Sequence, residues 1–278
     1  MGIGAAIIYG IIQGLSEFLP VSSSGHLALL PHFLHTTDPG TFFDLWMHLG
    51  TALAVLVYFR SLIWQHVLLL FRSNFFLKKD VSNAQDLSLL KNLVISTVST
   101  FILIIFLKKF ALDFGRSQRF ITFNMIFFGV ILWLSDKFSM KNKNKLEDQN
   151  SLMNSNIRLK EAIIIGLSQA IAIFPGVSRS GITLTSSRFL GLTREHSVSY
   201  SFLLGLPVIL GGIVFEVPQY LLSLGQTPQW GVWLTGLIVS FLVGLATVHL
   251  FLKWVGKIGL APFFVYRLLL GILLIFFA

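Results

Sequence analysis

Two polar residues near the N-terminus stand out because they lie within an apolar segment. Gln13 and Glu17 are four residues apart, so on a helix they share one face. An ionised carboxylate in such surroundings is unfavourable unless a partner compensates its charge. A hard divalent cation, Mg²⁺ or Ca²⁺, would do so, because it takes oxygen ligands from carboxylate, amide and phosphate groups together. A glutamate at a solvated helix end is the alternative, and the broken segment that follows favours the cation site.

A serine-rich turn follows directly, with the sequence Ser22-Ser23-Ser24-Gly25-His26. Gly25 lets the backbone approach a ligand closely, and the serines offer hydroxyl groups and helix caps. Ser23 and His26 are three residues apart, which is about one helical turn, so the imidazole could take a proton from the hydroxyl or from a water. We therefore expect Ser23 to be a nucleophile with His26 as its general base, and direct attack by water stays open.

A second polar segment lies in the other half of the chain. It contains Ser178, Arg179 and Ser180, with Thr183 four residues beyond Arg179. An arginine at membrane depth is unfavourable, and its planar fork of donors suits two-point contact with a phosphate. The backbone N–H groups of a helix that begins here would add a partial positive charge. These four residues are expected to bind an anion, and a structural ion pair between Arg179 and Glu17 is the alternative.

Three further polar residues lie in apolar segments. Arg267 is too deep in the last apolar segment to reach water easily, so we expect it to point into the same cavity and to bind substrate. Asp44 and His48 are four residues apart at the start of another segment, and a structural role is as well supported as a functional one. A cation, arginines, hydroxyls and an imidazole together suit a phosphorylated, membrane-soluble substrate.

The composition places the elements that hold these residues in lipid. Hydrophobic residues make up 54% of the 278 residues and charged residues 12%, which an ordinary water-soluble domain would not tolerate on its surface. The chain has no cysteine, so thiolate chemistry is excluded. Six apolar stretches predict helices that cross the membrane, at about 42–60, 92–107, 119–135, 197–217, 231–251 and 261–278. The fold class is therefore expected to be an all-α integral membrane protein.

An internal repeat relates the two polar segments. Residues 6–27 match residues 162–183 without gaps at an offset of 156, including Gln13 with Gln169 and Ser22 with Ser178. Each copy is an apolar run, a break with a proline, and a second short apolar run, which predicts a re-entrant helical hairpin. Non-helical backbone at membrane depth occurs only where it is buried in protein or lines a wet cavity, so each break is a candidate site.

The number of spans between the hairpins predicts an inverted repeat. Three spans separate the hairpins and three follow the second, so the second hairpin enters from the opposite face of the membrane. We expect residues 1–135 to form the first repeat, 136–160 a polar linker and 161–278 the second repeat, all within one membrane domain. The distribution of Lys and Arg predicts a cytoplasmic linker and both termini outside, so the net charge of +9 indicates orientation rather than nucleic-acid binding.

At these residues the chain resembles the bacterial undecaprenyl-diphosphate phosphatase family, whose members are associated with bacitracin resistance. The resemblance covers essentially the whole chain and rests on Gln13-Gly-Leu-Ser-Glu17-Phe-Leu-Pro-Val-Ser-Ser-Ser-Gly-His26, Phe43-Asp44, His48-Leu-Gly-Thr-Ala-Leu-Ala-Val55, Pro175-Gly-Val-Ser-Arg-Ser-Gly-Ile-Thr183, Ser201-Phe-Leu-Leu204 with Pro207, and Tyr266-Arg267. It implies a divalent-cation-dependent hydrolase that converts undecaprenyl diphosphate to the monophosphate carrier of peptidoglycan synthesis. It also implies the bacterial cytoplasmic (inner) membrane, with the site open to the outer side.

The resemblance also assigns roles to residues of this chain. The positions that match functional positions of the family are Glu17, Ser23, His26, Ser178, Arg179, Thr183 and Arg267, and Gln13 falls where the family allows Glu or Gln. A transporter or flippase for polyprenyl phosphate is the alternative function, because inverted repeats with broken helices are also a transporter architecture. The sequence does not determine the oligomeric state, for which a homodimer is one candidate.

Overall fold

The computed structural model describes residues 1–36, 38–71, 81–114, 117–141, 157–222 and 229–276, and these residues are helical apart from short connections. The helices are α1 (Ile3–Ser16), α2 (Ser23–Leu34), α3 (Thr41–Tyr58), α4 (Arg60–Phe71), α5 (Val81–Phe114), α6 (Gln118–Lys141), α7 (Leu159–Ala170), the 3-10 helix η2 (Ile171–Ile173), α8 (Arg179–Phe189), α9 (Arg194–Leu222), α10 (Trp230–Ile258) and α11 (Ala261–Phe276).

The lengths of the helices confirm an all-α membrane protein. Within the described residues, four helices are long and apolar enough to cross a membrane, namely Ser88–Ala111 in α5, Gln118–Met140 in α6, Arg194–Phe215 in α9 and Trp230–Ile258 in α10. Helices α3 and α4 make a fifth span if they are counted together, with a bend of 73° between them. The predicted sixth span is α11, whose 16 residues are fewer than the roughly 20 that the hydrocarbon core requires.

The two predicted hairpins begin their second arms with the same backbone geometry. Ser22 and Ser178 precede α2 and α8, and their φ angles are 74° and 73°. A positive φ is uncommon for a residue other than glycine, and such residues occur where the surrounding structure holds them in place. The hydroxyl of each serine lies 3.3 Å from the hydroxyl two residues later, in Ser24 or Ser180. Positions related by the offset of 156 therefore form matching turns.

Close packing holds each hairpin against a long helix from the other half of the chain. In α1, a Cβ added at Gly10 would lie 2.8 Å from Cβ of Val239 and 2.9 Å from the carbonyl oxygen of Gly236, both in α10. The equivalent Gly166 in α7 packs as closely on Ser96 of α5, whose Cα would lie 2.7 Å from an added Cβ. Only glycine permits these approaches. The division into 1–135, 136–160 and 161–278 stays a prediction, and residues 142–156 lie outside the described residues.

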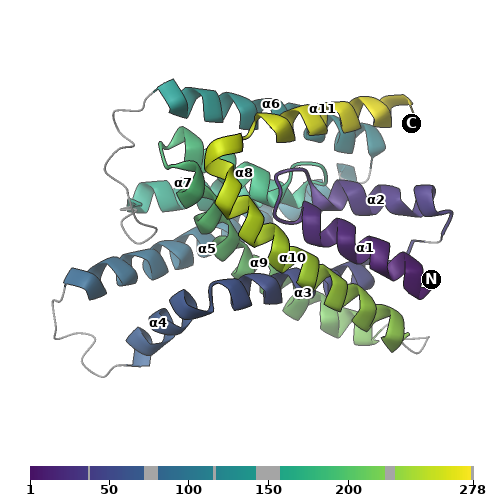
Figure 1. Cartoon of the computed structure of the whole chain (residues 1–278), viewed down its shortest axis with the longest axis horizontal. Helices are drawn as coiled ribbons and strands as arrows, with labels where there is room; N and C mark the ends of the chain where they lie inside the picture. The colour runs from purple at the N-terminus through teal and green to yellow at the C-terminus, as the bar shows by residue number, and fades with distance from the viewer. Residues whose placement is uncertain (37, 72–80, 115–116, 142–156, 223–228, 277–278) are drawn as a thin grey trace.

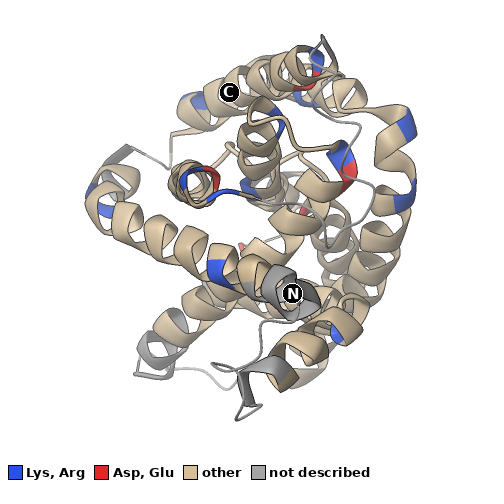
Figure 2. Ribbon diagram, turned by 90° about the vertical axis from the view of Figure 1, so that its left-hand side faces the viewer, with Lys and Arg blue, Asp and Glu red and all other residues tan. Residues whose placement is uncertain are grey.

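Figure 1 shows α1 and α2 side by side at the end of the molecule where both termini lie, with α7 and α8 toward the opposite end. A buried ion cluster joins α6, α8 and α9 at this opposite end. Asp136 accepts hydrogen bonds from Nε of Arg188 at 3.0 Å and from Nε and Nη2 of Arg194 at 2.9 and 2.8 Å. The N–H of Leu260 also donates to Asp136, at 3.2 Å. Figure 2 looks onto this end, and basic residues lie around its rim.

Candidate active site

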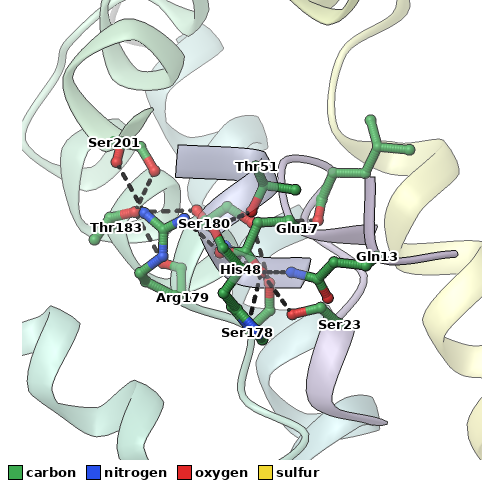
Figure 3. A network of polar contacts seen from close by, with 12 residues as sticks. Gln13, Glu17, Ser23, His48, Thr51, Ser178, Arg179, Ser180, Thr183 and Ser201 are labelled. Carbon is green, nitrogen blue, oxygen red and sulfur yellow. Dashed lines mark hydrogen bonds and ion pairs between the residues drawn. The ribbon is translucent and has the colours of Figure 1, made fainter. Parts of the chain in front are cut away.

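The Glu17 carboxylate is the junction of the two hairpins and α3. Its side chain is 5% exposed, and its Oε1 accepts a hydrogen bond from Nη2 of Arg179 at 2.8 Å. Its Oε2 accepts hydrogen bonds from Nε2 of Gln13 at 3.1 Å and from Oγ of Ser23 at 2.9 Å. Nε2 of His48 lies 3.3 Å from the same Oε2. Figure 3 shows these side chains converging on one carboxylate.

The broken helices explain how residues distant in sequence meet here. Helix α1 ends at Ser16 and α2 begins at Ser23, so Glu17 and Ser23 lie on the two sides of the same break. Helix α8 begins at Arg179, which is the repeat equivalent of Ser23 at the offset of 156. The second hairpin therefore brings a guanidinium to the place where the first hairpin brings a hydroxyl.

Helix α9 leaves room for the Arg179 side chain. Nη1 of Arg179 donates to the carbonyl oxygen of Ser201 at 3.3 Å. A Cβ at Gly205, one turn further along α9, would collide with the guanidinium. The absence of a side chain at Gly205 therefore allows Arg179 to lie against α9 while it reaches Glu17.

The polar groups line a pocket of about 260 Å³, near the lower end of the range for small-molecule sites. Four of the predicted site residues line it, namely Glu17, Ser23, Ser178 and Arg179. Ser16, Ser24 and His48 complete its polar side. A hydroxyl, a carboxylate, an imidazole and a guanidinium thus face one small volume, and together they can bind a phosphoryl group and assist its transfer.

Ser180 and Thr183, which the sequence predicts as anion ligands, are buried behind the pocket rather than lining it. Ser180 is 1% exposed, and its hydroxyl donates to the carbonyl oxygen of Leu19 at 3.2 Å. Thr183 is fully buried, and its hydroxyl lies 2.6 Å from that of Ser201. Both hydroxyl groups therefore bond within the protein and support the second hairpin. This geometry does not favour direct contact between either residue and an anion in the pocket.

His26 does not meet Ser23, contrary to the expectation from their spacing. Its Nδ1 lies 2.8 Å from the carbonyl oxygen of Ser22, and its Nε2 lies 2.6 Å from the hydroxyl of Tyr266, on whose ring it stacks. Because the carbonyl can only accept, Nδ1 carries a proton, and Nε2 accepts from Tyr266 when the ring is neutral. Both nitrogens are occupied, and the Ser23 hydroxyl donates to Glu17 instead.

Arg267 also lies outside the pocket, in contrast to its predicted role as a substrate ligand. Its side chain is fully buried, and every nitrogen donates to backbone carbonyls. Nη1 reaches Pro20 at the first break at 3.3 Å, and Nη2 reaches Gly176 at the second break at 2.8 Å. Nε reaches Met125 of α6 at 2.8 Å. The guanidinium therefore joins the two hairpin tips to α6 and has no donor directed at the pocket.

One buried oxygen without a hydrogen-bond partner shows whether the site could hold the expected divalent cation. Oε1 of Gln13 is buried and has no hydrogen-bond partner, and it belongs to the amide that contacts Glu17. An amide oxygen beside a carboxylate fits part of a hard-cation site. Among the described residues no group of three or more His, Cys, Asp and Glu could hold a metal ion. The donors therefore fit a cation that takes its other ligands from a phosphorylated substrate, not a site made of protein ligands alone.

Comparison with known proteins decides the family. The family model described as "Bacitracin resistance protein BacA" matches residues 6–273. The chain belongs to this BacA family. A relative from Alteromonas mediterranea named undecaprenyl-diphosphatase is 38% identical over 271 residues, which cover 98% of this chain and 97% of the relative. Relatives of the same name from Marinobacter nauticus and Hahella chejuensis are 34% and 38% identical, over 98% and 95% of this chain and 97% and 94% of theirs.

His48 lines the pocket, although its spacing in the sequence left a structural and a functional role equally supported. Its ring contacts Glu17 through Nε2 and lies 2.7 Å from the carbonyl oxygen of Asp44 through Nδ1. Its side chain is 26% exposed, so it is more accessible than Glu17. The available signal was a histidine within an apolar segment. Its proximity to Glu17 depends on packing between α3 and the first hairpin, which residue spacing does not reveal.

Proposed function

We propose that this protein hydrolyses undecaprenyl diphosphate to the monophosphate and inorganic phosphate. The observation that carries the proposal is the convergence of Ser23, His48 and Arg179 on the Glu17 carboxylate in one pocket. The activity named for the relatives agrees with this set of groups. Regeneration of the monophosphate carrier would support peptidoglycan synthesis, and this is the expected basis of bacitracin resistance.

The pocket has two sources of positive potential for a diphosphate. Helix α2 begins at Ser23 and α8 begins at Arg179, so two helix N-termini meet at the pocket, one from each hairpin. The first turn of a helix offers unpaired N–H groups and a partial positive charge. The Arg179 guanidinium adds a full charge and directional donors. These groups would hold the diphosphate and stabilise the charge that develops during transfer.

The hydrogen bond between Ser23 and Glu17 determines the proposed chemistry. As Oγ of Ser23 attacks the terminal phosphorus, the new Oγ–P bond forms and the bridging P–O bond breaks, so polyprenyl monophosphate leaves. The hydroxyl proton passes to Oε2 of Glu17, which already accepts it at 2.9 Å. Water then attacks the phosphorus of the phosphoserine, the Oγ–P bond breaks as phosphate leaves, and the Glu17 carboxyl returns the proton to Oγ of Ser23. A cation held by Gln13 and Glu17 together with the diphosphate would neutralise phosphate oxygens.

The proposed setting is the bacterial cytoplasmic (inner) membrane, with the pocket open to the outer side. The helix composition supports a multi-pass membrane protein. If the basic 136–160 linker is cytoplasmic, the end that carries both termini lies outside (Figure 1). Leu45 lies near the start of α3 and lines the pocket, which supports an opening toward this end. The pocket is formed by one chain, so the proposed hydrolysis does not require the candidate homodimer.

An assay of the purified protein tests the proposal. Detergent-solubilised protein is incubated with long-chain polyprenyl diphosphate, with and without a chelator, and released phosphate is measured. Hydrolysis requires no membrane gradient, so phosphate release is expected, with loss on chelation and recovery when Mg²⁺ or Ca²⁺ is returned. A protein that binds the lipid but releases no phosphate in any of these conditions would support the transporter alternative instead.

A further inference from the structure

The pocket has an apolar side as well as a polar one. The apolar lining comes from three elements, with Leu45 in α3, Ala172 in η2, and Val208, Ile209 and Gly212 in α9. A diphosphate needs none of these groups. A hydrocarbon chain that is attached to the diphosphate does, because apolar surface is favoured where it is removed from water.

One face of α9 connects the two sides of the pocket. Ser201, Gly205, Val208 and Gly212 are spaced by four, three and four residues, so they lie along one helix face. The first two contact the Arg179 guanidinium, and the last two line the apolar side. Gly212 is seven positions after Gly205, which corresponds to about 10 Å along a helix. The face therefore leads from the anion-binding group to an apolar surface.

This face has a gap at Gly212. A Cβ added at Gly212 would meet no atom within 4 Å, whereas one added at Gly211 would lie 2.8 Å from Cζ of Phe101. Two apolar side chains that follow it on α9 are exposed, Val214 to 73% and Phe215 to 55%. Gly212 thus lies where the pocket approaches the outer surface of the helix bundle.

We infer that the hydrocarbon chain of the lipid substrate leaves the pocket past Gly212, along α9 and opposite Leu45. The identity of this chain as a polyprenyl group rests on the proposed function. The diphosphate end lies at Arg179 and the chain end must reach the bilayer, and the α9 face joins these two places. The glycine keeps this exit open, so position 212 sets whether a bulky chain can pass.

The absence of cysteine from the chain permits a direct test. The thiol introduced by Gly212→Cys is allowed to react with N-ethylmaleimide in detergent, and its labelling rate is measured with no addition, with inorganic pyrophosphate, and with long-chain polyprenyl monophosphate. The monophosphate carries the hydrocarbon chain and is not turned over. The matched control is Gly231→Cys, because Gly231 is also helical, has no atom within 4 Å of an added Cβ, and is outside the pocket lining.

Polyprenyl monophosphate at about ten times its Kd leaves roughly a tenth of the sites free, so labelling of Gly212→Cys should slow about tenfold. Gly231→Cys should be unaffected, and pyrophosphate should protect neither variant. Three outcomes overturn the inference. Labelling of both variants slows equally, labelling of Gly212→Cys does not slow with polyprenyl monophosphate, or pyrophosphate protects Gly212→Cys, whether or not the monophosphate also does. Labelling does not depend on turnover. If the monophosphate protects Gly212→Cys but the wild-type protein releases no phosphate from polyprenyl diphosphate, the proposed hydrolysis is wrong and the exit stands. If the wild-type protein releases phosphate but Gly212→Cys is not protected, the exit is wrong and the hydrolysis stands.

Discussion

At the scale of single residues, Glu17 shows how one buried charge organises a site. An isolated carboxylate inside a membrane protein is unfavourable, and each of its oxygens here has a donor. The sequence-based alternatives of ion pair and functional group are not exclusive, because Arg179 pairs with Glu17 and both line the pocket. Glu17 can therefore hold the free site together and act on a bound substrate.

Glu17→Gln should reduce turnover by about 10²- to 10⁴-fold, the range that a positioned general base supplies. The amide keeps the shape of the side chain but cannot accept the Ser23 proton in the same way, and it weakens the cation site. Phosphate release is measured over a range of Mg²⁺ concentrations, with thermal unfolding as the check on folding. Near-normal turnover in a folded variant would refute both assigned roles of Glu17.

Arg179→Lys should reduce kcat/KM by about ten- to a hundredfold. An ammonium group is a point charge that cannot reproduce the two-point contact of a guanidinium, and one lost charge-assisted hydrogen bond corresponds to about 1.5–3 kcal/mol. Steady-state kinetics with polyprenyl diphosphate measure the effect. If lysine supports full activity at this position, charge alone is sufficient and the geometric argument for arginine is wrong.

Substitutions of His26 distinguish a positioning role from the general-base role that its spacing from Ser23 predicts. In the structure its Nδ1 donates to the carbonyl of Ser22, the residue with positive φ just before Ser23. His26→Ala removes this donor and should impair activity. His26→Asn places an amide donor near the same point and should restore at least about a tenth of the activity, since one neutral hydrogen bond contributes about 1 kcal/mol. Comparison of kcat for the two variants is decisive, because a base role predicts equal loss in both.

At the scale of elements, the sequence predicts the hairpins well because their signals are local. Proline, serine and glycine at each break determine where a helix can end and begin, and the offset of 156 relates the breaks to each other. Contacts between elements are not local. His48 lies beside Glu17 because the first hairpin packs against α3. The Arg267 nitrogens donate to backbone carbonyls because the hairpin tips pack against α6. Residue spacing carries no information about that packing.

Arg267→Lys tests the joining of the hairpin tips. A lysine cannot reach the carbonyls of Pro20, Gly176 and Met125 together, and each buried carbonyl that loses its partner costs about 1–3 kcal/mol. The melting temperature in detergent should fall clearly below that of the wild-type protein. Arg119→Lys, at an exposed position on α6, is the control and should melt as the wild type does. A raised KM with an unchanged melting temperature would instead restore Arg267 as a substrate ligand.

At the scale of the whole molecule, the pocket and the buried ion cluster lie in different parts of the helix bundle. The pocket with its apolar side lies at the breaks of the two hairpins, whereas the cluster around Asp136 fills the end opposite the termini with buried ion pairs (Figure 1). The cluster draws on α6, α8 and α9 and on the N–H of Leu260 before α11. One carboxylate thus fixes the ends of several helices from both halves of the chain.

Asp136→Asn should destabilise the whole protein without altering the pocket. The substitution keeps the shape of the side chain but leaves Arg188, 3% exposed, and Arg194 without their counter-charge. Removal of one partner from a buried ion pair typically costs about 3–5 kcal/mol. The matched control is Glu161→Gln, whose partner Arg158 has an 84% exposed side chain, and an exposed pair contributes about 0–1 kcal/mol. Thermal unfolding should therefore separate the two variants, while KM for polyprenyl diphosphate, measured below the transition, stays at the wild-type value in both. An equal melting temperature for the two would show that the cluster does not hold this end together, and a changed KM in Asp136→Asn alone would show that it is coupled to the pocket.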